Sequence, residues 1–346
     1  MNESTLPFML EQVCQGQHLS EAQAYGQFNL FMQGKLSAIE MSALLTALKA
    51  KGESPSEIMG ALKLLRENSF TFKHQDTIKQ NMNLVDCVGT GGDGQQSLNI
   101  STACAFVLAA LDVKVAKHGN RSVSSKCGSA DLFEKLGVNL EMKPECALKA
   151  LQDIGLCFLY SPLYHPSMNQ IRQVRSTLKV KTLFNLLGPL LNPLQPQTML
   201  VGVYDHKYCE ILVKVLQQTG VQRALVIHGE GLDEIAIHGK TLGYYLKENE
   251  IVPFELSPTM AGLPYYPLDE IKGKDIAYNT QACLDLLQGK GSIAYRASVA
   301  INAGAILWLQ DKVTCIKQGV EMAQSVMSTN RAFEKLNLLK ELSHAK

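Results

Sequence analysis

The 346-residue sequence has almost no net charge, no long apolar run and no membrane-targeting start. Each absence argues against a class of function. Its 33 basic and 32 acidic residues leave a formal net charge of +1, so a broad basic surface for nucleic acid is not expected. No segment approaches the roughly 20 apolar residues of a transmembrane helix. Met1–Ser4 lacks the basic start of a signal peptide. We therefore expect a cytoplasmic protein with neither a membrane nor a nucleic-acid partner.

Familiar motifs for metals, nucleotides and covalent catalysis are also missing. None of the nine cysteines forms a C-x-x-C pair, and most lie in apolar runs such as Ala103–Phe106, which favours reduced, buried thiols. The glycine-rich run near residue 90 matches neither the P-loop nor the dinucleotide fingerprint. No Ser/His/Asp or Cys/His arrangement is evident, so the sequence does not indicate catalysis through a covalent intermediate.

Residues 1 to about 70 predict a small module of helices. Three capping-box pairs, in which a serine precedes a Glu or Gln by three positions, mark helix starts. They are Ser20 with Gln23, Ser37 with Glu40, and Ser54 with Glu57. Ile39, Leu44, Leu45 and Leu48 form an apolar stripe that ends near Gly52. The apolar stripes of this module suit either its core or a dimer surface, because so short a module has little interior.

From residue 84 onward, short apolar strands alternate with helices. Strands are predicted at residues 84–88, 113–117, 199–204, 223–228 and 234–238, and helices at residues 100–111, 208–219 and 299–309. This alternation predicts an α/β fold in which a small N-terminal helical domain precedes a larger α/β domain with a mainly parallel central sheet. We place the domains at residues 1–75 and 80–346. A helical pattern at 171–187 interrupts the alternation, so part of 165–195 is expected to pack on the helical domain.

Two donor-rich segments follow the first strand of the α/β region. Glycines at 89, 91, 92 and 94 surround Asp93 and let the backbone approach a ligand, while consecutive N–H groups form an anion site. Asn99–Thr102 then opens a helix, where the N–H groups and the helix dipole favour phosphate. Ser101 also offers a hydroxyl oxygen to magnesium. Taken alone, the first segment would be only a turn and the second only a helix cap.

Two further segments complete a candidate site at strand ends. Lys117–Lys126 combines lysine, arginine and hydroxyl groups that suit a diphosphate, although a solvated basic loop is the alternative. Asp233 and Glu234 follow another strand and suit two magnesium positions, or one magnesium with bridging waters. We interpret His228 and His238 beside them as structural, because zinc would require better-spaced ligands. Ligands of open α/β sheets gather at strand ends, so the segments are expected to converge.

These segments together carry a resemblance to a known family. Gly89–Asp93, Asn99–Thr102, Lys117–Ser122, Thr182–Pro193 and Asp233–Glu234 resemble the anthranilate phosphoribosyltransferases, in order, from about residue 8 to about residue 335. The resemblance implies a nucleoside phosphorylase/phosphoribosyltransferase-like fold and a homodimer formed through the helical domain. It also implies transfer of a phosphoribosyl group from 5-phosphoribosyl 1-diphosphate to anthranilate, the second step of tryptophan biosynthesis from chorismate.

The resemblance assigns roles to individual residues. The implied diphosphate-substrate contacts are Gly89, Gly92, Asp93, Ser97, Asn99, Ser101, Thr102, Lys117 and Ser129. The implied anthranilate contacts are Gly89, His118, Asn120, Arg175 and Pro189. Ser101, Asp233 and Glu234 are the implied ligands of Mg2+, at about two ions per subunit. No residue is assigned as an acid, a base or a nucleophile.

The chain departs from the family pattern at two positions. Lys179–Thr182 stands where Gly-Ile-Arg-Thr is usual, so Lys181 keeps the charge but loses a bidentate contact. Cys127 stands where serine is frequent. Neither position belongs to the assigned contacts, so we expect an active enzyme.

Two other functions remain possible on the sequence alone. A pyrimidine nucleoside phosphorylase would share this fold group, but Lys117–Asn120 and the Asp233–Glu234 pair argue against it. A non-catalytic relative that binds nucleic acid would conflict with the net charge of +1 and with the intact carboxylate pair. Phosphorolysis of thymidine would support the first alternative, and a steeply salt-dependent DNA affinity would support the second.

Overall fold

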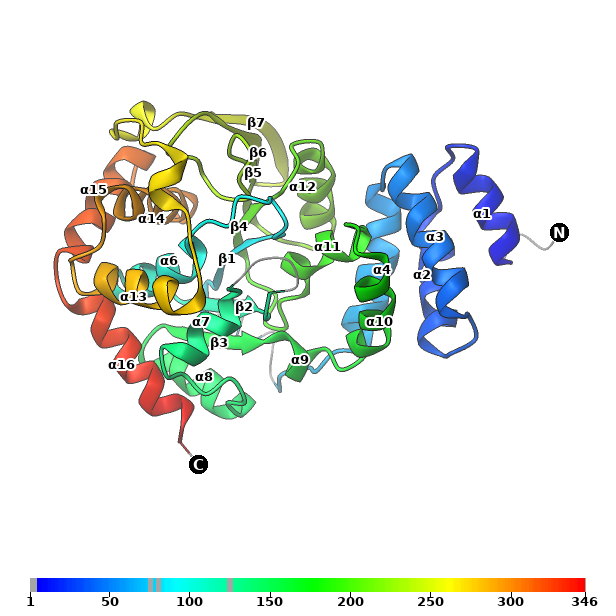
Figure 1. The fold of residues 1–346 in the computed structure, drawn as a ribbon, viewed down its shortest axis with the longest axis horizontal. Helices are drawn as coiled ribbons and strands as arrows, with labels where there is room; N and C mark the ends of the chain where they lie inside the picture. Colours follow the sequence, from blue (N-terminus) through cyan, green and yellow to red (C-terminus); the bar gives the residue numbers. More distant parts are fainter. Residues whose placement is uncertain (1–4, 74–76, 79–81, 123–126, 346) are drawn as a thin grey trace. The chain divides into compact units, whose positions relative to one another are not determined.

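The chain forms two compact units in the computed structural model, which describes residues 5–73, 77–78, 82–122 and 127–345. A helical unit comprises residues 1–71 and 162–193, and an α/β unit comprises residues 72–161 and 194–346. Figure 1 shows the helices of the first unit and the sheet of the second. The expected fold class, a helical domain and a larger α/β domain with a mainly parallel sheet, is confirmed.

The helical unit is built from short helices with local start signals. Its helices are α1 (Leu6–Cys14), α2 (Glu21–Met32), α3 (Ala38–Lys51), α4 (Pro55–Glu67), α10 (Met168–Leu178), α11 (Leu183–Leu187) and the 3-10 helix η1 (Gly188–Leu191). All three predicted capping boxes are confirmed, with reciprocal bonds at Ser20, Ser37 and Ser54. Gly52 ends α3 with a φ of 94°, as a glycine cap should.

One member of the predicted apolar stripe was assigned to the wrong face. Ile39 is 82% exposed, whereas Met41, Leu44, Leu45 and Leu48 are fully buried. Ile39 precedes Leu44 by five positions, which at 3.6 residues per turn places it about 140° around the helix. The buried stripe of α3 therefore begins at Met41.

The predicted helix at 171–187 is wrong, because the structure has two helices there. Lys179 ends α10 in the left-handed region, with a φ of 51°. A new helix then starts after Thr182, whose N–H donates to Asn185 Oδ1 at 3.0 Å. Both helices belong to the helical unit, and this local break separates Arg175 from the segment that contains Lys181.

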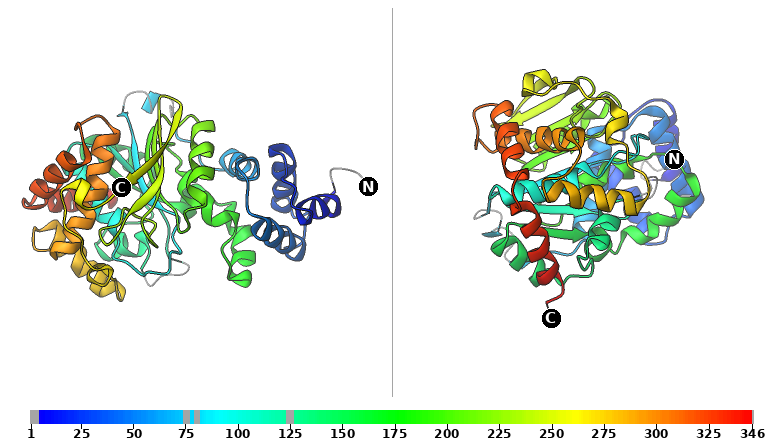
Figure 2. Two further views of the ribbon diagram at one scale, coloured as in Figure 1. Left: turned by 90° about the horizontal axis from the view of Figure 1, so that it is seen from above. Right: turned by 60° about the vertical axis from the view of Figure 1, so that its left-hand side comes forward.

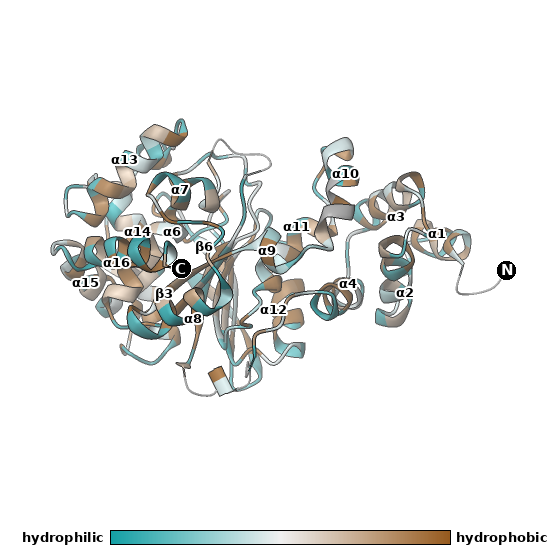
Figure 3. Ribbon diagram, turned by 90° about the horizontal axis from the view of Figure 1, so that it is seen from below, coloured by the Kyte–Doolittle hydropathy of each residue, from teal (hydrophilic) through white to brown (hydrophobic). Residues whose placement is uncertain are grey.

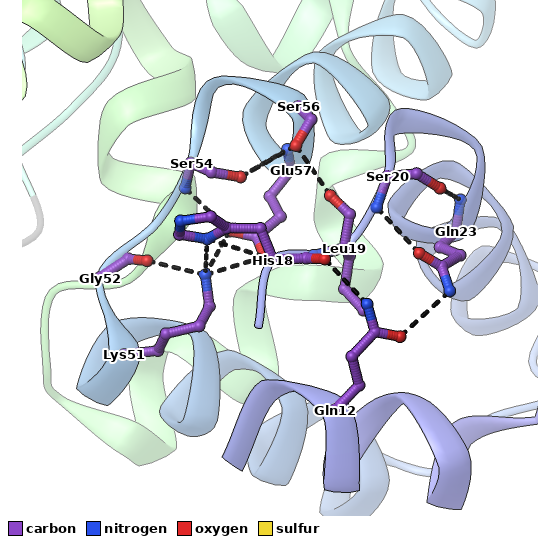
Figure 4. A network of polar contacts seen from close by, with 10 residues as sticks. All are labelled: Gln12, His18, Leu19, Ser20, Gln23, Lys51, Gly52, Ser54, Ser56 and Glu57. Atoms are coloured by element: carbon purple, nitrogen blue, oxygen red, sulfur yellow. Dashed lines mark hydrogen bonds and ion pairs between the residues drawn. The ribbon is translucent and has the colours of Figure 1, made fainter. Parts of the chain in front are cut away.

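A buried carboxylate joins three segments of the helical unit (Figure 4). Glu57 is completely buried and accepts hydrogen bonds from the N–H groups of Leu19 and Ser54, each at 2.8 Å. Lys51, itself 4% exposed at its side chain, forms an ion pair with Glu57 at 2.9 Å and also contacts His18 Nδ1. Every oxygen of this carboxylate thus has a donor, which is the condition for keeping a charge in a protein interior.

The α/β unit is organised around a seven-stranded sheet in the order β3-β2-β1-β4-β5-β6-β7. The strands are β1 (Val85–Gly89), β2 (Val115–Gly119), β3 (Leu156–Tyr160), β4 (Thr198–Gly202), β5 (Arg223–His228), β6 (Thr241–Lys247) and β7 (Glu250–Leu256). The first five are parallel, and β6 and β7 add an antiparallel hairpin. The nearly unbroken burial of β1 to β5 is typical of parallel strands covered on both faces.

Helices cover both faces of this sheet (Figure 2). They are α6 (Ile100–Ala110), α7 (Ser129–Lys135), α8 (Pro144–Asp153), α12 (Tyr208–Gln218), α13 (Ile276–Leu287), α14 (Ile293–Leu309), α15 (Ile316–Met327) and α16 (Arg331–Ser343). Short elements are α9 (Ser161–Tyr164), η2 (Thr259–Ala261) and η3 (Leu268–Ile271). Buried α6 packs on β1 and on α14, whereas α12 packs on β5 and β6. Along α8 and α16, hydrophobic and hydrophilic residues alternate, as expected for helices with one exposed face (Figure 3).

The predicted strand at 234–238 is wrong. Its backbone bonds to side chains: Ile235 N–H donates to Asn302 Oδ1, and Ala236 N–H donates to Thr241 Oγ1. Ile235, Ala236 and Ile237 are all buried, so the segment is an interior connection between β5 and the hairpin. The hairpin itself and β3 were not predicted.

The strand order reverses beside β1. From β1 the chain proceeds to β2 and β3 on one side and then returns to β4 on the other side. The carboxyl ends of β1 and β4 therefore lie at a topological switch point, where ligands of open α/β sheets bind. Among the described residues, no helix is both long enough and apolar enough to cross a membrane.

Candidate active site

Two glycines allow a carboxylate-bearing segment to lie on the switch point. Gly89 and Gly202 are register partners at the ends of β1 and β4. A Cβ on Gly89 would collide with the Asp233 carboxyl group, and one on Gly202 would collide with the Asp233 carbonyl oxygen. The absence of a side chain at both positions thus leaves room for Asp233 beside the ends of the central strands.

The glycine-rich loop after β1 has the backbone conformation that its composition predicts. Gly91, Gly92 and Gly94 have φ values of 68°, 78° and 81°, in a region that favours glycine. The Gly91 N–H donates to Asp233 Oδ2 at 2.6 Å, so this loop and the Asp233 segment meet. The two sequence motifs, 142 positions apart, form one site.

Unlike Glu57, which is paired with Lys51, the carboxylates of Asp93, Asp233 and Glu234 form no ion pair with a described residue. Asp93 accepts one hydrogen bond, from Gln95 N–H to Oδ1, but its Oδ2 is buried without a bond from any described donor. Desolvation, followed by the charge of Asp93, raises the pKa of Asp233 to about 7. Burial, with smaller effects of Cys87 and Asp233, raises the pKa of Glu234 well above its usual range. Such a cluster favours a bound proton or a cation.

The first turn of α6 contacts the same carboxylates. Ser101 N–H donates to Glu234 Oε1 at 3.2 Å, which holds this carboxylate at the helix N-terminus. Thr102 is buried in the same turn. Ser97, before the helix, forms an isolated antiparallel bridge with Lys272. Of these three residues, Ser101 contacts the Glu234 segment directly.

The end of β2 supplies the cationic side of the site. Lys117 is buried, with 2% exposure, and its charge acts on Glu234 to oppose the rise of the carboxyl pKa. His118 is buried beside it, and Asn120 is exposed after the strand. The Ser129 hydroxyl contacts the Asn120 carbonyl oxygen at 3.4 Å, so the start of α7 lies against this strand end.

Arg121 does not extend the cationic side of the site. Its guanidinium forms ion pairs with Asp131 at 3.0 Å and Glu134 at 2.8 Å. These hydrogen bonds raise its pKa, and they commit the side chain to α7. Residues 123–126 of the predicted donor-rich loop lie outside the described residues.

The backbone carbonyl of Cys127, the position where serine is frequent, accepts a hydrogen bond from Asn99 Nδ2 at 3.1 Å. Because the bond uses the main chain, the cysteine side chain does not interrupt it. The thiol is buried, and burial raises its pKa to about 11, so it is a thiol at neutral pH. All nine cysteines are free, and six of them are buried, as the sequence suggested.

The histidines near Asp233 have structural hydrogen bonds. His228 Nδ1 contacts the Val203 carbonyl oxygen at 2.8 Å, and its Nε2 accepts from Gly231 N–H. His238 Nε2 contacts the Glu230 carbonyl oxygen at 3.0 Å. Within the described ranges, no three His, Cys, Asp or Glu side chains are arranged to hold a metal ion unaided.

Two predicted anthranilate residues belong to the helical unit. Arg175 lies in α10, and burial lowers the pKa of its guanidinium. No described residue forms an ion pair with it, in contrast to Lys51 of the same unit. Pro189 is buried in η1. The remaining predicted anthranilate contacts, Gly89, His118 and Asn120, belong to the α/β unit.

Sequence reasoning missed two residues that hold Asn99. Asn279 Nδ2 donates to Asn99 Oδ1 at 3.2 Å, and the Tyr295 hydroxyl donates to the Asn99 carbonyl oxygen at 3.3 Å. Both side chains are buried, on α13 and α14. A signal did exist: Asn279 shares an apolar stripe with Cys283, Leu286 and Leu287, where a polar side chain requires a partner.

Comparison with known proteins identifies the family. A family model described as a glycosyl transferase family a/b domain matches residues 81–333, and one described as a helical bundle domain of that family matches residues 9–69. The chain is 43% identical over 343 residues to anthranilate phosphoribosyltransferase of Shewanella sp. strain MR-7, covering 99% of both chains. It is also 43% identical to that of Colwellia psychrerythraea, covering 99% of this chain and 93% of the relative. The chain belongs to the anthranilate phosphoribosyltransferase family.

Solved structures agree with this family assignment. Anthranilate phosphoribosyltransferase from Thermus thermophilus is similar at a TM-score of 0.89 and 35% identity, covering 97% of this chain and 99% of that one. The yeast enzyme, solved in complex with PRPP and Mg, shares the fold at a TM-score of 0.87 and 24% identity, covering 99% and 98%. The predicted resemblance is confirmed, and the chain is an enzyme of this transferase family.

Proposed function

We propose that this chain transfers the phosphoribosyl group of 5-phosphoribosyl 1-diphosphate to anthranilate, releasing diphosphate and N-(5-phosphoribosyl)anthranilate. The observation that carries the proposal is that the glycine-rich loop contacts Asp233, and the start of α6 contacts Glu234, at the switch point. Family membership over the full chain length supports the same reaction.

The diphosphate substrate would bind across the carboxyl ends of β1 and β2. Backbone N–H groups of the loop containing Gly92, together with the N-terminus of α6, are suited to phosphate oxygens. Lys117 adds a positive charge, and Ser97, Asn99, Thr102 and Ser129 add polar groups at the same strand ends. Gly89 leaves room for close backbone approach.

The side chains fit magnesium better than a softer metal. Asp93 Oδ2 is buried without a described donor, and the raised pKa values of Asp233 and Glu234 support the binding of a cation beside these carboxyl groups. Ser101, Asp233 and Glu234 would hold about two Mg2+ ions per subunit, with substrate oxygens as the remaining ligands. Bound Mg2+ would supply neutralisation of the leaving diphosphate. Calorimetric titration of Mg2+ in the presence of the diphosphate substrate would give the number of ions.

Arg175 is proposed to orient anthranilate through its carboxylate. Its guanidinium is partly withdrawn from water, and no described residue supplies a carboxylate partner. A carboxylate ligand would satisfy it through charge-assisted hydrogen bonds. His118, Asn120, Gly89 and Pro189 are the other proposed contacts of this substrate.

The chemistry requires positioning more than proton transfer. Displacement of diphosphate from the anomeric carbon develops positive charge on the ribose and negative charge on the leaving group. Donors already fixed around the leaving group stabilise that charge without reorganisation. The attacking aromatic amine is neutral, so holding it near the anomeric carbon supplies much of the remaining acceleration.

The assembly state and location are further parts of the proposal. A homodimer through the helical domain would cover exposed apolar side chains such as Ile39 of α3. Light scattering should then give twice the chain mass, and a monomer mass would reject the dimer. The nine free cysteines are consistent with the reducing cytoplasm.

The decisive test follows anthranilate fluorescence with purified protein, 5-phosphoribosyl 1-diphosphate and Mg2+. We expect the signal to fall only when all components are present, and a magnesium-free mixture serves as the control. An unchanged signal in the complete mixture would contradict the proposed reaction.

A further inference from the structure

A chain of amide hydrogen bonds passes through Asn99 and ends on main-chain groups at both sides. Lys274 N–H donates to Asn279 Oδ1 at 2.9 Å, and Asn279 Nδ2 donates to Asn99 Oδ1 at 3.2 Å. Asn99 Nδ2 then donates to the Cys127 carbonyl oxygen at 3.1 Å. Three segments that are far apart in sequence, at the starts of α6, α7 and α13, are thereby joined.

The direction of this chain of bonds is fixed by its ends. A backbone N–H can only donate, so Asn279 must present its oxygen to Lys274 and its NH2 group to Asn99. A backbone carbonyl can only accept, so Asn99 must present its NH2 group to Cys127. Both amide orientations are therefore determined without ambiguity, and a carboxylate at position 279 cannot replace the amide.

Neighbouring contacts hold this arrangement in place. Gly273 N–H donates to the Gln96 carbonyl oxygen at 2.7 Å, and Leu98 N–H donates to the Ile271 carbonyl oxygen at 2.8 Å. A Cβ on Gly273 would lie 2.9 Å from both polar atoms of the Asn279 amide. The segment 271–274 is thus hydrogen-bonded to the segment before α6, and the Asn279 side chain contacts both.

We propose that Asn279 is a positioning residue for the diphosphate substrate, acting through Asn99 to fix the start of α6 relative to the start of α7. This inference rests on the proposed function, because those two helix starts contain Ser101, Thr102 and Ser129. Asn279 is 4% exposed and is bonded to Lys274 and Asn99, and Asn99 in turn is bonded to Cys127, two positions before Ser129. Its role is to set their spacing.

The sharpest probe is Asn279→Asp, which has nearly the same shape. The carboxylate keeps the bond from Lys274 but sets an oxygen against Asn99 Oδ1. If the Asn99 amide rotates so that its NH2 group donates to this carboxylate, the Asn99 amide oxygen faces the Cys127 carbonyl oxygen. Either the Asn279–Asn99 or the Asn99–Cys127 hydrogen bond is therefore lost. We expect the affinity for 5-phosphoribosyl 1-diphosphate to fall about 10-fold or more, with less than about a twofold change in the KM for anthranilate.

A matched control makes the same chemical change on the exposed side of the same helix. Gln281 lies two positions further along α13, and its side chain is exposed. Gln281→Glu should leave substrate affinity within about twofold of wild type. Tyr295→Phe removes only the bond to the Asn99 carbonyl oxygen and should give a smaller loss than Asn279→Asp.

The experiment measures binding of 5-phosphoribosyl 1-diphosphate with Mg2+ by calorimetry, and hydrogen exchange of the peptides covering residues 97–102 and 127–135. Asn279→Asp should weaken binding and increase exchange in both peptides, and should have no further effect on binding in an Asn99→Ala background. Wild-type affinity and unchanged exchange in folded Asn279→Asp would overturn the positioning role. Wild-type protein that binds this substrate but does not consume anthranilate would contradict only the proposed reaction.

Discussion

Each unit contains a buried carboxylate, Glu57 in the helical unit and Glu234 in the α/β unit, and the two differ in the groups around them. In the helical unit, Glu57 has a buried lysine and two backbone N–H groups around it. In the α/β unit, the Gly91 N–H donates to Asp233 and the Ser101 N–H donates to Glu234, and the pKa values of both carboxyl groups are raised. Glu57 and Glu234 are both buried, so burial alone does not explain the difference.

The difference separates a structural charge from a functional one. Glu57 is satisfied by the chain itself, and its contacts join α3, α4 and the segment before α2. Asp233 and Asp93 face each other with too few donors, which costs folding free energy. Proteins retain such unfavourable groups at sites where a ligand supplies the missing charge.

The largest effect on stability is expected at Glu57. Glu57→Ala would remove the carboxylate that is paired with the buried Lys51 and that accepts from the Leu19 and Ser54 N–H groups, which should lower the free energy of unfolding by about 3–5 kcal/mol. Urea denaturation measures this loss. Glu40→Ala is the matched control, since Glu40 occupies the same capping-box position of α3 but is exposed. Equal losses in the two variants would contradict the structural role.

Removal of the Asp233 carboxylate should reduce activity without reducing stability, in contrast to the loss of stability expected for Glu57→Ala. Asp233→Asn should lower kcat/KM by about 10²–10³-fold, as loss of charge stabilisation at a transition state does. Its metal-free stability should stay the same or increase, because one of two facing carboxyl groups is removed. Steady-state kinetics and urea denaturation measure both quantities, with the exposed Asp269→Asn as control. A large loss of stability in Asp233→Asn would assign Asp233 to the same class as Glu57.

Arg175 of the helical unit differs from Lys51, because no described residue forms an ion pair with its guanidinium. Arg175→Ala should raise the KM for anthranilate by about 10-fold or more, as loss of a charged hydrogen bond does. The KM for 5-phosphoribosyl 1-diphosphate should change much less. Lys63→Ala, at an exposed cation of the same unit, is the control. Equal effects on the two substrates would remove the proposed role of Arg175.

The pH dependence of metal-free stability gives the smallest expected effect. The pKa of Asp233 is about 7 in the folded chain, against an ordinary value of 3.8. Between these values the folded chain holds a proton that the unfolded chain has lost, so stability falls as pH rises through this window. Between about pH 4 and pH 7, the free energy of unfolding of the wild type should fall by at least about 1.4 kcal/mol more than that of Asp233→Asn, which is the equivalent of one pKa unit. Urea denaturation at about pH 4 and pH 7 measures this, and a pH-independent difference between the two proteins would contradict the assigned burial.

Local signals predicted the parts of the fold that depend on neighbours in sequence. The capping boxes at Ser20, Ser37 and Ser54 form because each pair is only three residues apart. The strand predicted at 234–238 is wrong because the Ile235 and Ala236 N–H groups donate to the side chains of Asn302 and Thr241, which the sequence pattern does not reveal as partners. A strand requires a neighbouring strand, and pairing is not a local property.

For the candidate site, the sequence likewise predicted the segments that meet but not the residues that hold them. Glycines, carboxylates and helix starts indicated the segments that meet, since strand ends of one sheet edge converge. The residues that hold those segments were missed, because Asn279 differs from an ordinary buried helix residue only by its need for partners. The ion pairs of Arg121 with Asp131 and Glu134 were also not predicted from the sequence, because they depend on the position of α7.

The central claim is that the carboxylates at the β1–β4 switch point form a magnesium-dependent site for the diphosphate substrate. The most direct measurement is calorimetric binding of 5-phosphoribosyl 1-diphosphate to wild type and to Asp233→Asn/Glu234→Gln, each with and without Mg2+. We predict tight binding only for wild type with Mg2+. Equal affinity in all four experiments would contradict the claim.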